Sequence, residues 1–179
     1  MAALTDSHHR YGFVTRVLHW GMALLFAAQL ASAAAHALLP REHALRETLW
    51  SYHPTLGATL FVLVLLRGAW GLFNLPRRPP HSGTLGRAAV AGHAAIYALM
   101  VVVPGVRLLA AAGGTRGFDY LGFRIFAPRE TEIAWMQAPA ELHGEMGWIL
   151  AVLIAGHVFM ALVWHRLVQR DEVLGRMAG

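Results

Sequence analysis

The chain has 179 residues, of which 56% are hydrophobic and 14% are charged, and it contains no cysteine. Because about a quarter of the residues in a soluble domain are charged, this composition excludes a disordered protein and argues against a soluble globular one. The lack of cysteine excludes disulfides, thiolate zinc sites, iron–sulfur clusters and covalently attached c-type haem. The formal net charge is +5 and every basic residue is arginine. The arginines follow membrane topology, so we predict no nucleic-acid partner.

Four stretches of the sequence contain no charged residue, and each is close to the roughly 20 residues that a membrane-spanning helix needs. They run from 17 to 40, 48 to 66, 88 to 106 and 146 to 165. With their flanks they predict spans at about 14–39, 48–72, 86–108 and 143–166. The predicted fold class is therefore all-α: an integral membrane four-helix transmembrane bundle made by a single membrane domain, residues 1–179.

The connections between the predicted spans indicate their orientation. The connection from Arg67 to Arg87 holds four arginines and no acidic residue, whereas basic and acidic residues balance in the other two. By the positive-inside rule, this connection and both chain termini are cytoplasmic. The longest connection, about 107–141, then faces outward, and its aromatic residues predict a folded cap on the membrane surface. A cleavable signal peptide in residues 1–35 is disfavoured because His19 and Gln29 interrupt its apolar part.

Histidines lie inside these spans, where an ionisable residue is a functional candidate. Neutral imidazole is a good ligand for haem iron; the alternative for any one histidine is a structural hydrogen bond to a nearby carbonyl. His143 and His157 are 14 residues apart, which places them within about 40° of one helix face and about 21 Å apart along its axis. One helix would thus present ligands to two haems at different depths. The histidines in or at the ends of spans are His19, His36, His53, His93, His143, His157 and His165.

Four of these histidines are followed one helical turn later by glycine or alanine, whose small side chains leave room for a porphyrin face. The four are His19, His53, His143 and His157, and the two glycines are Gly57 and Gly147. Depth then pairs the four histidines. His53 and His143 open their spans at the outer side, and His19 and His157 lie toward the cytoplasmic side. The sequence predicts that each pair binds one haem iron between two helices.

Further residues are candidates for positions around the haems and for a quinone site. His93 is either a rival ligand on the cytoplasmic side or a residue that hydrogen-bonds a propionate or a quinone. Arg67 lies 14 residues after His53, and it either pairs with a haem propionate or extends to the headgroups as a boundary arginine. Candidates for a quinone near the inner surface are Arg16, His165 and Arg166.

At these residues the sequence resembles the bacterial di-haem cytochrome b561 family, which is related to the cytochrome b subunits of nickel–iron hydrogenases and formate dehydrogenases. The resemblance covers roughly residues 10 to 170, with the order and spacing of the motifs kept. The matching motifs are Arg16-Val-Leu-His19-Trp20, His53-x-x-x-Gly57, Leu63 to Arg67, Gly92-His93-x-x-Ile96-Tyr97 with Pro104-Gly105, Leu142-His143-Gly144-Glu145 and Gly156-His157. The 14-residue histidine pair of the last span is the most specific of these.

The resemblance implies a multi-pass protein of the bacterial inner (plasma) membrane that carries electrons through two b haems. The family's axial ligands fall on His19, His53, His143 and His157, in agreement with the pairing from depth. A membrane quinone, ubiquinone, is the implied redox partner. Some family members oxidise superoxide and reduce quinone, so superoxide oxidase activity is one implied form of the function. Pro54 departs from the pattern, because proline restricts the preceding ligand; it is tolerated in a first helical turn.

Two other functions remain alternatives. The chain could be a cytochrome b membrane anchor or relay subunit for a partner dehydrogenase, with a periplasmic or membrane redox protein as electron donor. A histidine-based metal transporter is the second, although such a protein would be expected to offer acidic ligands inside its spans. The sequence does not choose between superoxide and a protein as donor, nor between an enzyme and an electron relay.

Overall fold

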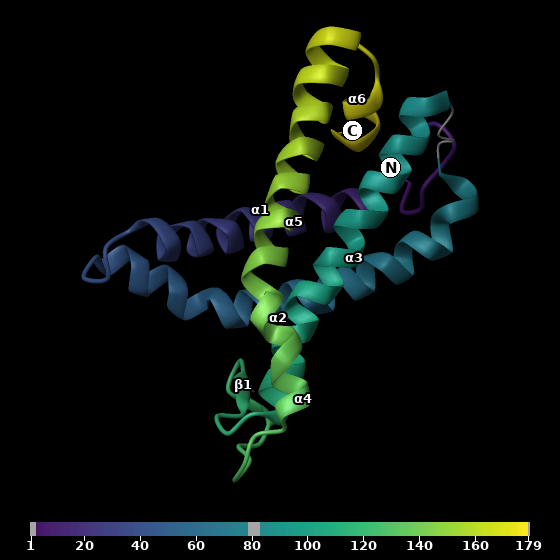
Figure 1. Ribbon diagram of the computed structural model, residues 1–179. Helices are drawn as coiled ribbons and strands as arrows, with labels where there is room; N and C mark the ends of the chain where they lie inside the picture. The colour runs from purple at the N-terminus through teal and green to yellow at the C-terminus, as the bar shows by residue number, and fades with distance from the viewer. Residues whose placement is uncertain (1–2, 79–82, 179) are drawn as a thin grey trace.

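The computed structural model describes residues 3–78 and 83–178, and four long helices dominate it (Figure 1). In this part of the chain, four candidate membrane spans are long and apolar enough to cross a bilayer: Phe13–Leu38, Ala44–Arg77, Gly83–Gly113 and Ala134–Gln169. The all-α prediction with four apolar helices is confirmed. The elements in chain order are α1 (Phe13–Leu38), α2 (Ala44–Asn74), η1 (Leu75–Arg77), α3 (Gly83–Gly113), β1 (Phe118–Tyr120), β2 (Phe123–Phe126), α4 (Ala134–Gln137), η2 (Ala138–Leu142), α5 (His143–Phe159), the π-helical segment η3 (Met160–Gln169) and α6 (Val173–Ala178).

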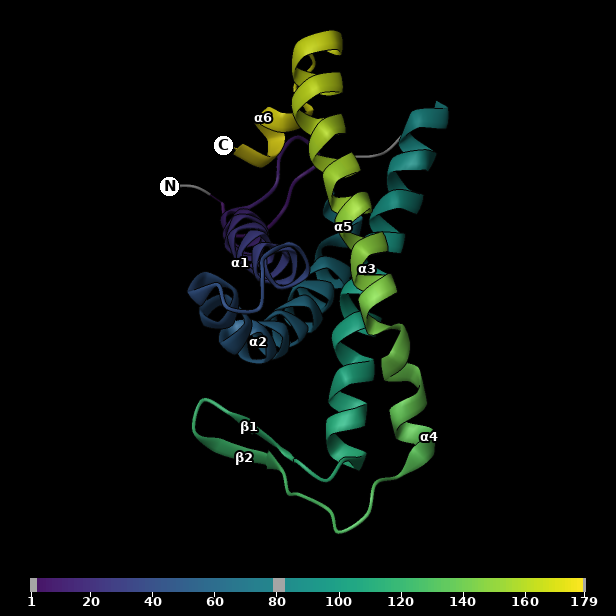
Figure 2. The same cartoon turned by 60° about the vertical axis from the view of Figure 1, so that its left-hand side comes forward.

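The long helices form two antiparallel pairs, α1 with α2 and α3 with α5, and these pairs cross one another at a steep angle. Figure 2 looks nearly along the first pair, while the second pair stands upright in the same view. A short turn, residues 39–43, joins α1 to α2. Many of the residues of α1 are alanines, and small side chains let helix backbones approach closely in an apolar medium. The sequence predicted the four helices but not this crossing.

The core lies where the two pairs meet. It consists of Met22, Val64, Met100 and Leu150, one from each long helix and each at most 4% exposed. Leu150 is seven residues from both His143 and His157, which is about 10 Å along the helix in either direction. The core therefore separates two levels of histidine.

The helix α2 begins earlier than the charge-free stretch predicted. It starts at Ala44, after His43, whose imidazole accepts a hydrogen bond from the backbone of Leu45. Glu47, which bounded the charge-free stretch, therefore lies within its first turn together with Arg46. Pro54 consequently lies inside the helix and not in its first turn, where it removes one backbone hydrogen bond.

The connection between α3 and α5 is folded, as predicted for the cap. Strands β1 and β2 pair antiparallel around the turn residues Leu121 and Gly122, both of which have positive φ (50° and 87°). Such angles at both turn residues are typical of the tight turns in two-residue hairpins. The Tyr120 hydroxyl lies 3.0 Å from that of Thr59 on α2, which ties the hairpin to the first helix pair.

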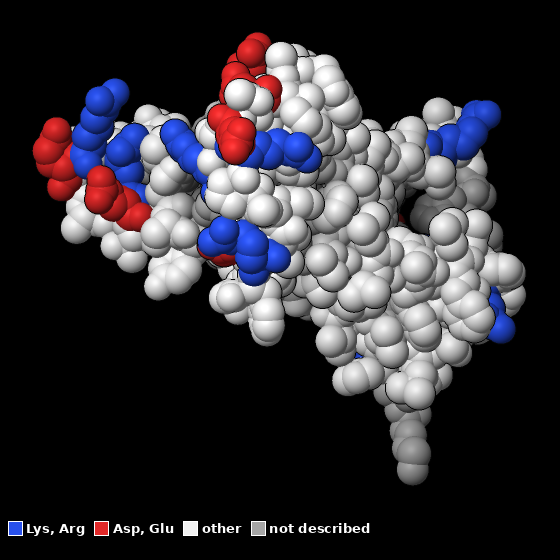
Figure 3. All heavy atoms as spheres, turned by 90° about the horizontal axis from the view of Figure 1, so that it is seen from below, with Lys and Arg blue, Asp and Glu red and all other residues white. Residues whose placement is uncertain are grey.

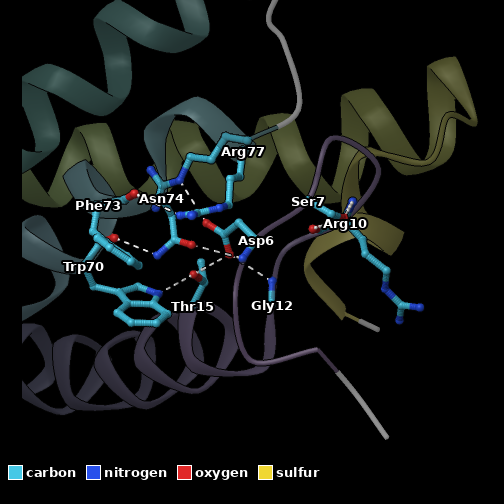
Figure 4. A network of polar contacts seen from close by, with 10 residues as sticks. Asp6, Ser7, Arg10, Gly12, Thr15, Trp70, Phe73, Asn74 and Arg77 are labelled. Atoms are coloured by element: carbon cyan, nitrogen blue, oxygen red, sulfur yellow. Dashed lines mark hydrogen bonds and ion pairs between the residues drawn. The ribbon is translucent and has the colours of Figure 1, made fainter.

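A buried carboxylate joins the N-terminal segment to α1 and to the end of α2 (Figure 4). Asp6 accepts hydrogen bonds from the backbone of Gly12 (2.9 Å) and from the Thr15 hydroxyl (2.6 Å). Its second oxygen accepts from Nε of Arg78 at 3.1 Å, and the Asp6 side chain is fully buried. The Asp6 backbone donates to Asn74, which is itself fully buried. Buried charge requires such complete hydrogen bonding.

Candidate functional site

Two clusters of polar residues occupy the two histidine levels. The His53 cluster consists of His53, His143, Ser32, Gln29 and Trp50. The ring centroids of His53 and His143 are 6.2 Å apart. An ion bonded to two imidazole nitrogens at about 2 Å each would hold the ring centroids about 6 Å apart. The two rings therefore have the separation that is expected when two imidazoles bind one metal ion.

Hydrogen bonds determine which nitrogen of His53 carries the proton. The Ser32 hydroxyl donates to the carbonyl of Gln29 at 2.7 Å. A hydroxyl has one proton, so Nδ1–H of His53 must be the donor in its 2.7 Å contact with Ser32. In a neutral ring Nε2 then has a free lone pair, and it accepts from the Gln29 amide at 3.1 Å. The same amide donates to the His53 carbonyl at 3.2 Å.

His143 is held in the same tautomer by the backbone. Its Nδ1 lies 2.8 Å from the carbonyl oxygen of Val103, and a carbonyl only accepts, so Nδ1 carries the proton. This arrangement, in which Nδ1–H bonds a carbonyl and Nε2 keeps its lone pair, is the usual one for a metal-binding histidine. Both histidines of this cluster thus carry the lone pair on Nε2. The Gln29 amide, which donates to Nε2 of His53 in this structure, would have to give up that hydrogen bond for His53 to bind a metal ion.

The His19 cluster, on the other side of the core, consists of His19, His93, His157, Arg67 and Tyr97. The His19 and His157 centroids are 6.1 Å apart, and those of His93 and His157 are 5.1 Å apart. Nη2 of Arg67 donates to Nδ1 of His19 at 2.9 Å, and its guanidinium carbon lies 5.5 Å from the Tyr97 ring centroid. The structure thus brings together the predicted pair and the predicted rival His93, and it places the Arg67 cation beside them.

The donor sets suit haem iron better than a bare metal ion. Across residues 3–78 and 83–178, no group of three or more His, Cys, Asp or Glu side chains has the geometry to hold a metal ion. A bare zinc ion takes four ligands. Iron in a porphyrin takes four nitrogens from the macrocycle and needs only two axial ligands from the protein. Two imidazoles at each level meet that need.

The predicted small residues differ in what they face. A Cβ atom at Gly57 would lie 3.3 Å from the Gln29 amide nitrogen, so this glycine borders the His53 cluster. A Cβ at Gly147 would have no neighbour within 4 Å among the described residues. The proposed haem contact of Gly147 stays a prediction.

The three quinone candidates do not form one site by direct contact. Nε of Arg16 is buried without a hydrogen-bond partner in the described part of the chain. His165 donates from Nδ1 to Asp171 at 2.7 Å, and Arg166 is exposed. The αL conformation of Arg170 (φ 54°) reverses the chain and brings Asp171 back to His165. No hydrogen bond or ion pair joins the three candidates to one another within the described ranges.

An aromatic stack that was not predicted extends from the His53 cluster to His36. The His36 ring stacks on Trp50 with centroids 3.8 Å apart, and Trp50 stacks on His53 at 4.5 Å. Trp50 and His53 are three residues apart on α2 and so share a face. That spacing could have indicated the stack from the sequence. Gln29 and Ser32, two polar residues three positions apart in an apolar helix, could likewise have indicated hydrogen bonds to a histidine.

Four apolar helices with a pair of facing imidazoles at each of two levels define a membrane cytochrome of the b type. The chain belongs to the prokaryotic cytochrome b561 family, whose sequence profile matches residues 10–179. It is 27% identical to cytochrome b561 homolog 2 of Escherichia coli (strain K12) over 181 residues, which cover 99% of this chain and 95% of that protein. The predicted resemblance is confirmed. Membership of this family implies haem b and haem-mediated electron transfer across a membrane.

Proposed function

We propose that this protein carries electrons across the membrane through two b haems, one held by His53 and His143 and the other by His19 and His157. The observation that supports this proposal is the separation of the ring centroids, 6.2 and 6.1 Å. Each value matches the distance expected for imidazoles on opposite sides of one iron. His93 is assigned to the surroundings of the second haem and not to its iron.

The side chains around each pair have distinct tasks. A bound haem supplies an iron that gains or loses one electron. Ser32 and the Val103 carbonyl fix the ring orientation and the tautomer of His53 and His143, which keeps Nε2 available as ligand. The core residues between the two levels exclude water. With two imidazoles to hold each haem, the protein would leave no place for oxygen on the iron, and the haem would supply one-electron transfer.

Arg67 gives the two levels different electrostatics. Its side chain donates to His19, whereas the corresponding partners in the His53 cluster are a neutral hydroxyl and a neutral amide. A cation stabilises an added electron or a propionate nearby, and more strongly where the dielectric constant is low. Arg67 would therefore hold the propionate of a haem bound beside it, and its charge would raise the reduction potential of that haem.

The partners and the topology are further parts of the proposal. We assign ubiquinone as the membrane redox partner, on the family resemblance, with Arg16, His165 and Arg166 as candidates for its site. We place both chain termini in the cytoplasm of a bacterium, on the arginine distribution. Electron donors that fit this scheme are superoxide and a redox protein, and an anchor or relay role for a partner dehydrogenase uses the same two haems.

The experiment that tests the proposal is a count of haems in the full chain purified in detergent. The pyridine haemochrome assay should give two b haems per chain, with low-spin bands that carbon monoxide does not alter. His143→Ala and His157→Ala should each lose one haem, and the two variants should retain haems with different midpoint potentials. His9→Ala, a change in the exposed N-terminal segment, is the matched control and should retain both. A single haem in the unsubstituted chain, or loss of both in either variant, would contradict the assignment.

A further inference from the structure

A small pocket lies at the α1–α2 turn. It has a volume of about 220 Å³ and is lined by His36, Arg46, Glu47, Trp50 and Ser51. These residues belong to the last turn of α1 and the first two turns of α2, so the pocket is at the end of two candidate membrane spans. Figure 3 shows charges of both signs gathered at this end of the molecule, on the left, beside a broad surface without charge. Lipid headgroups occupy this level of a membrane protein.

The pocket contains hydrogen-bond donors that the protein does not satisfy. Arg46 donates from Nε to the His36 carbonyl (3.0 Å) and from Nη2 to Nε2 of the His36 ring (3.4 Å). Arginine has no acceptor, so Nε2 is the acceptor and Nδ1 of the neutral ring carries the proton. That Nδ1 is buried and has no hydrogen-bond partner among the described residues. Arginine has five N–H groups, and Arg46, which lines the pocket, uses two of them on His36, so others remain to bind an oxygen ligand.

Two opposite charges line the pocket without neutralising each other. Within the described ranges, neither Arg46 nor Glu47 forms an ion pair. The two residues are adjacent in the sequence, and both line the cavity. A ligand that satisfies both must carry a negative and a positive group a few bonds apart.

The lining also distinguishes between kinds of ammonium group. A quaternary ammonium is recognised by the open faces of aromatic rings. Trp50 stacks on His36 and on His53, and apart from the stacked His36 the lining offers no second aromatic ring to enclose such a group. A primary ammonium has three N–H donors, and the Glu47 carboxylate accepts them.

We propose that this pocket binds the headgroup of a zwitterionic phospholipid with a primary amine, of the phosphatidylethanolamine type. The phosphate oxygens accept from the N–H groups of Arg46. The ammonium group donates to Glu47. The bound headgroup lies against the stack of His36 and Trp50, and this stack extends to His53.

Native mass spectrometry of the full-length protein tests this proposal. The protein is delipidated in detergent and offered phosphatidylethanolamine, phosphatidylcholine or phosphatidylglycerol with identical acyl chains. Phosphatidylethanolamine should be retained about tenfold more strongly than phosphatidylcholine, the factor expected for one charge-assisted hydrogen bond. Arg46→Gln should abolish retention and Arg46→Lys should keep most of it. Glu47→Gln should remove the preference for ethanolamine over choline.

Matched controls come from the same turn. Arg41→Gln and Glu42→Gln change neighbouring charges that do not line the pocket, and both should bind lipid like the unsubstituted chain. Circular dichroism of every variant checks that helix content is kept. Equal retention of the three lipids, preference for phosphatidylglycerol, or equal loss in Arg46→Gln and Arg41→Gln would each overturn the proposal. So would displacement of the lipid by millimolar inorganic phosphate, which would indicate a site for a free anion.

Discussion

Replacing Asp6 should destabilise the protein more than any other single change in its N-terminal segment. Asp6→Ala leaves the Arg78 guanidinium, the Gly12 amide and the Thr15 hydroxyl without their acceptor. Removing one partner of a buried ion pair costs about 3–5 kcal/mol. The Arg78 side chain is 23% exposed and regains some hydration, so we expect about 3 kcal/mol, the lower end of that range.

The measurement is equilibrium unfolding in mixed micelles, followed by the loss of helical circular dichroism. Asp6→Asn keeps the shape and one acceptor oxygen but loses the charge, and it should cost about 1.5–3 kcal/mol. The matched control is Asp119→Ala, which removes a carboxylate from an ion pair with Arg124 whose two side chains are each 56% exposed. That change should leave the unfolding free energy almost unaltered. If Asp6→Ala were no more destabilising than Asp119→Ala, the reasoning from burial would be refuted.

Three further outcomes follow from other parts of the structure. Leu150→Ala, in the core between the two pairs, should lower the unfolding free energy by about 2–5 kcal/mol; Val152→Ala, which is 70% exposed, serves as its control in the same micelle assay. Ser32→Ala removes the acceptor of the His53 Nδ1–H and should weaken haem binding about 10- to 100-fold, measured as retention of one haem against an apomyoglobin acceptor. The hydrogen bond from the neighbouring imidazole lowers the pKa of the Asp171 carboxyl. Its stabilising contribution is therefore present above the ordinary aspartate pKa and is lost as the pH falls through the lowered value, which limited proteolysis of α6 on acidification should detect.

The sequence predicted the number and character of the helices because a bilayer imposes a strong requirement on composition. The span predicted at about 48–72 lies within helix α2, which begins at Ala44. Arg46 and Glu47 are charged but lie in the first helical turn, where side chains reach the interface. The crossing of the two pairs depends on side-chain packing at Met22, Val64 and their neighbours, which no periodicity in the sequence reports.

Only part of the candidate site could likewise be predicted from the sequence. The 14-residue spacing of His143 and His157 on one helix follows from helix geometry, and the sequence alone could use it. Their role as iron ligands stays a prediction. The hydrogen bonds of His53 to Ser32 and Gln29 join two helices, so no local pattern specified them. His165 was a quinone candidate because of its depth in the span. In the structure the chain turns back after it, and its Nδ1 donates to Asp171, six residues later.

The core between the two histidine levels also has a consequence for the energy of the membrane. His143 and His157 lie about 21 Å apart along α5, in a hydrocarbon layer about 30 Å thick. To the extent that this separation lies along the membrane normal, one electron moving between two haems bound at these levels would cross up to about two-thirds of the transmembrane voltage. Since a full crossing is worth about 2.3 kcal/mol per 100 mV, each transfer would be assisted or opposed by up to about 1.5 kcal/mol per 100 mV. Membrane voltage would thus bias the direction of electron transfer between two haems bound on either side of this core.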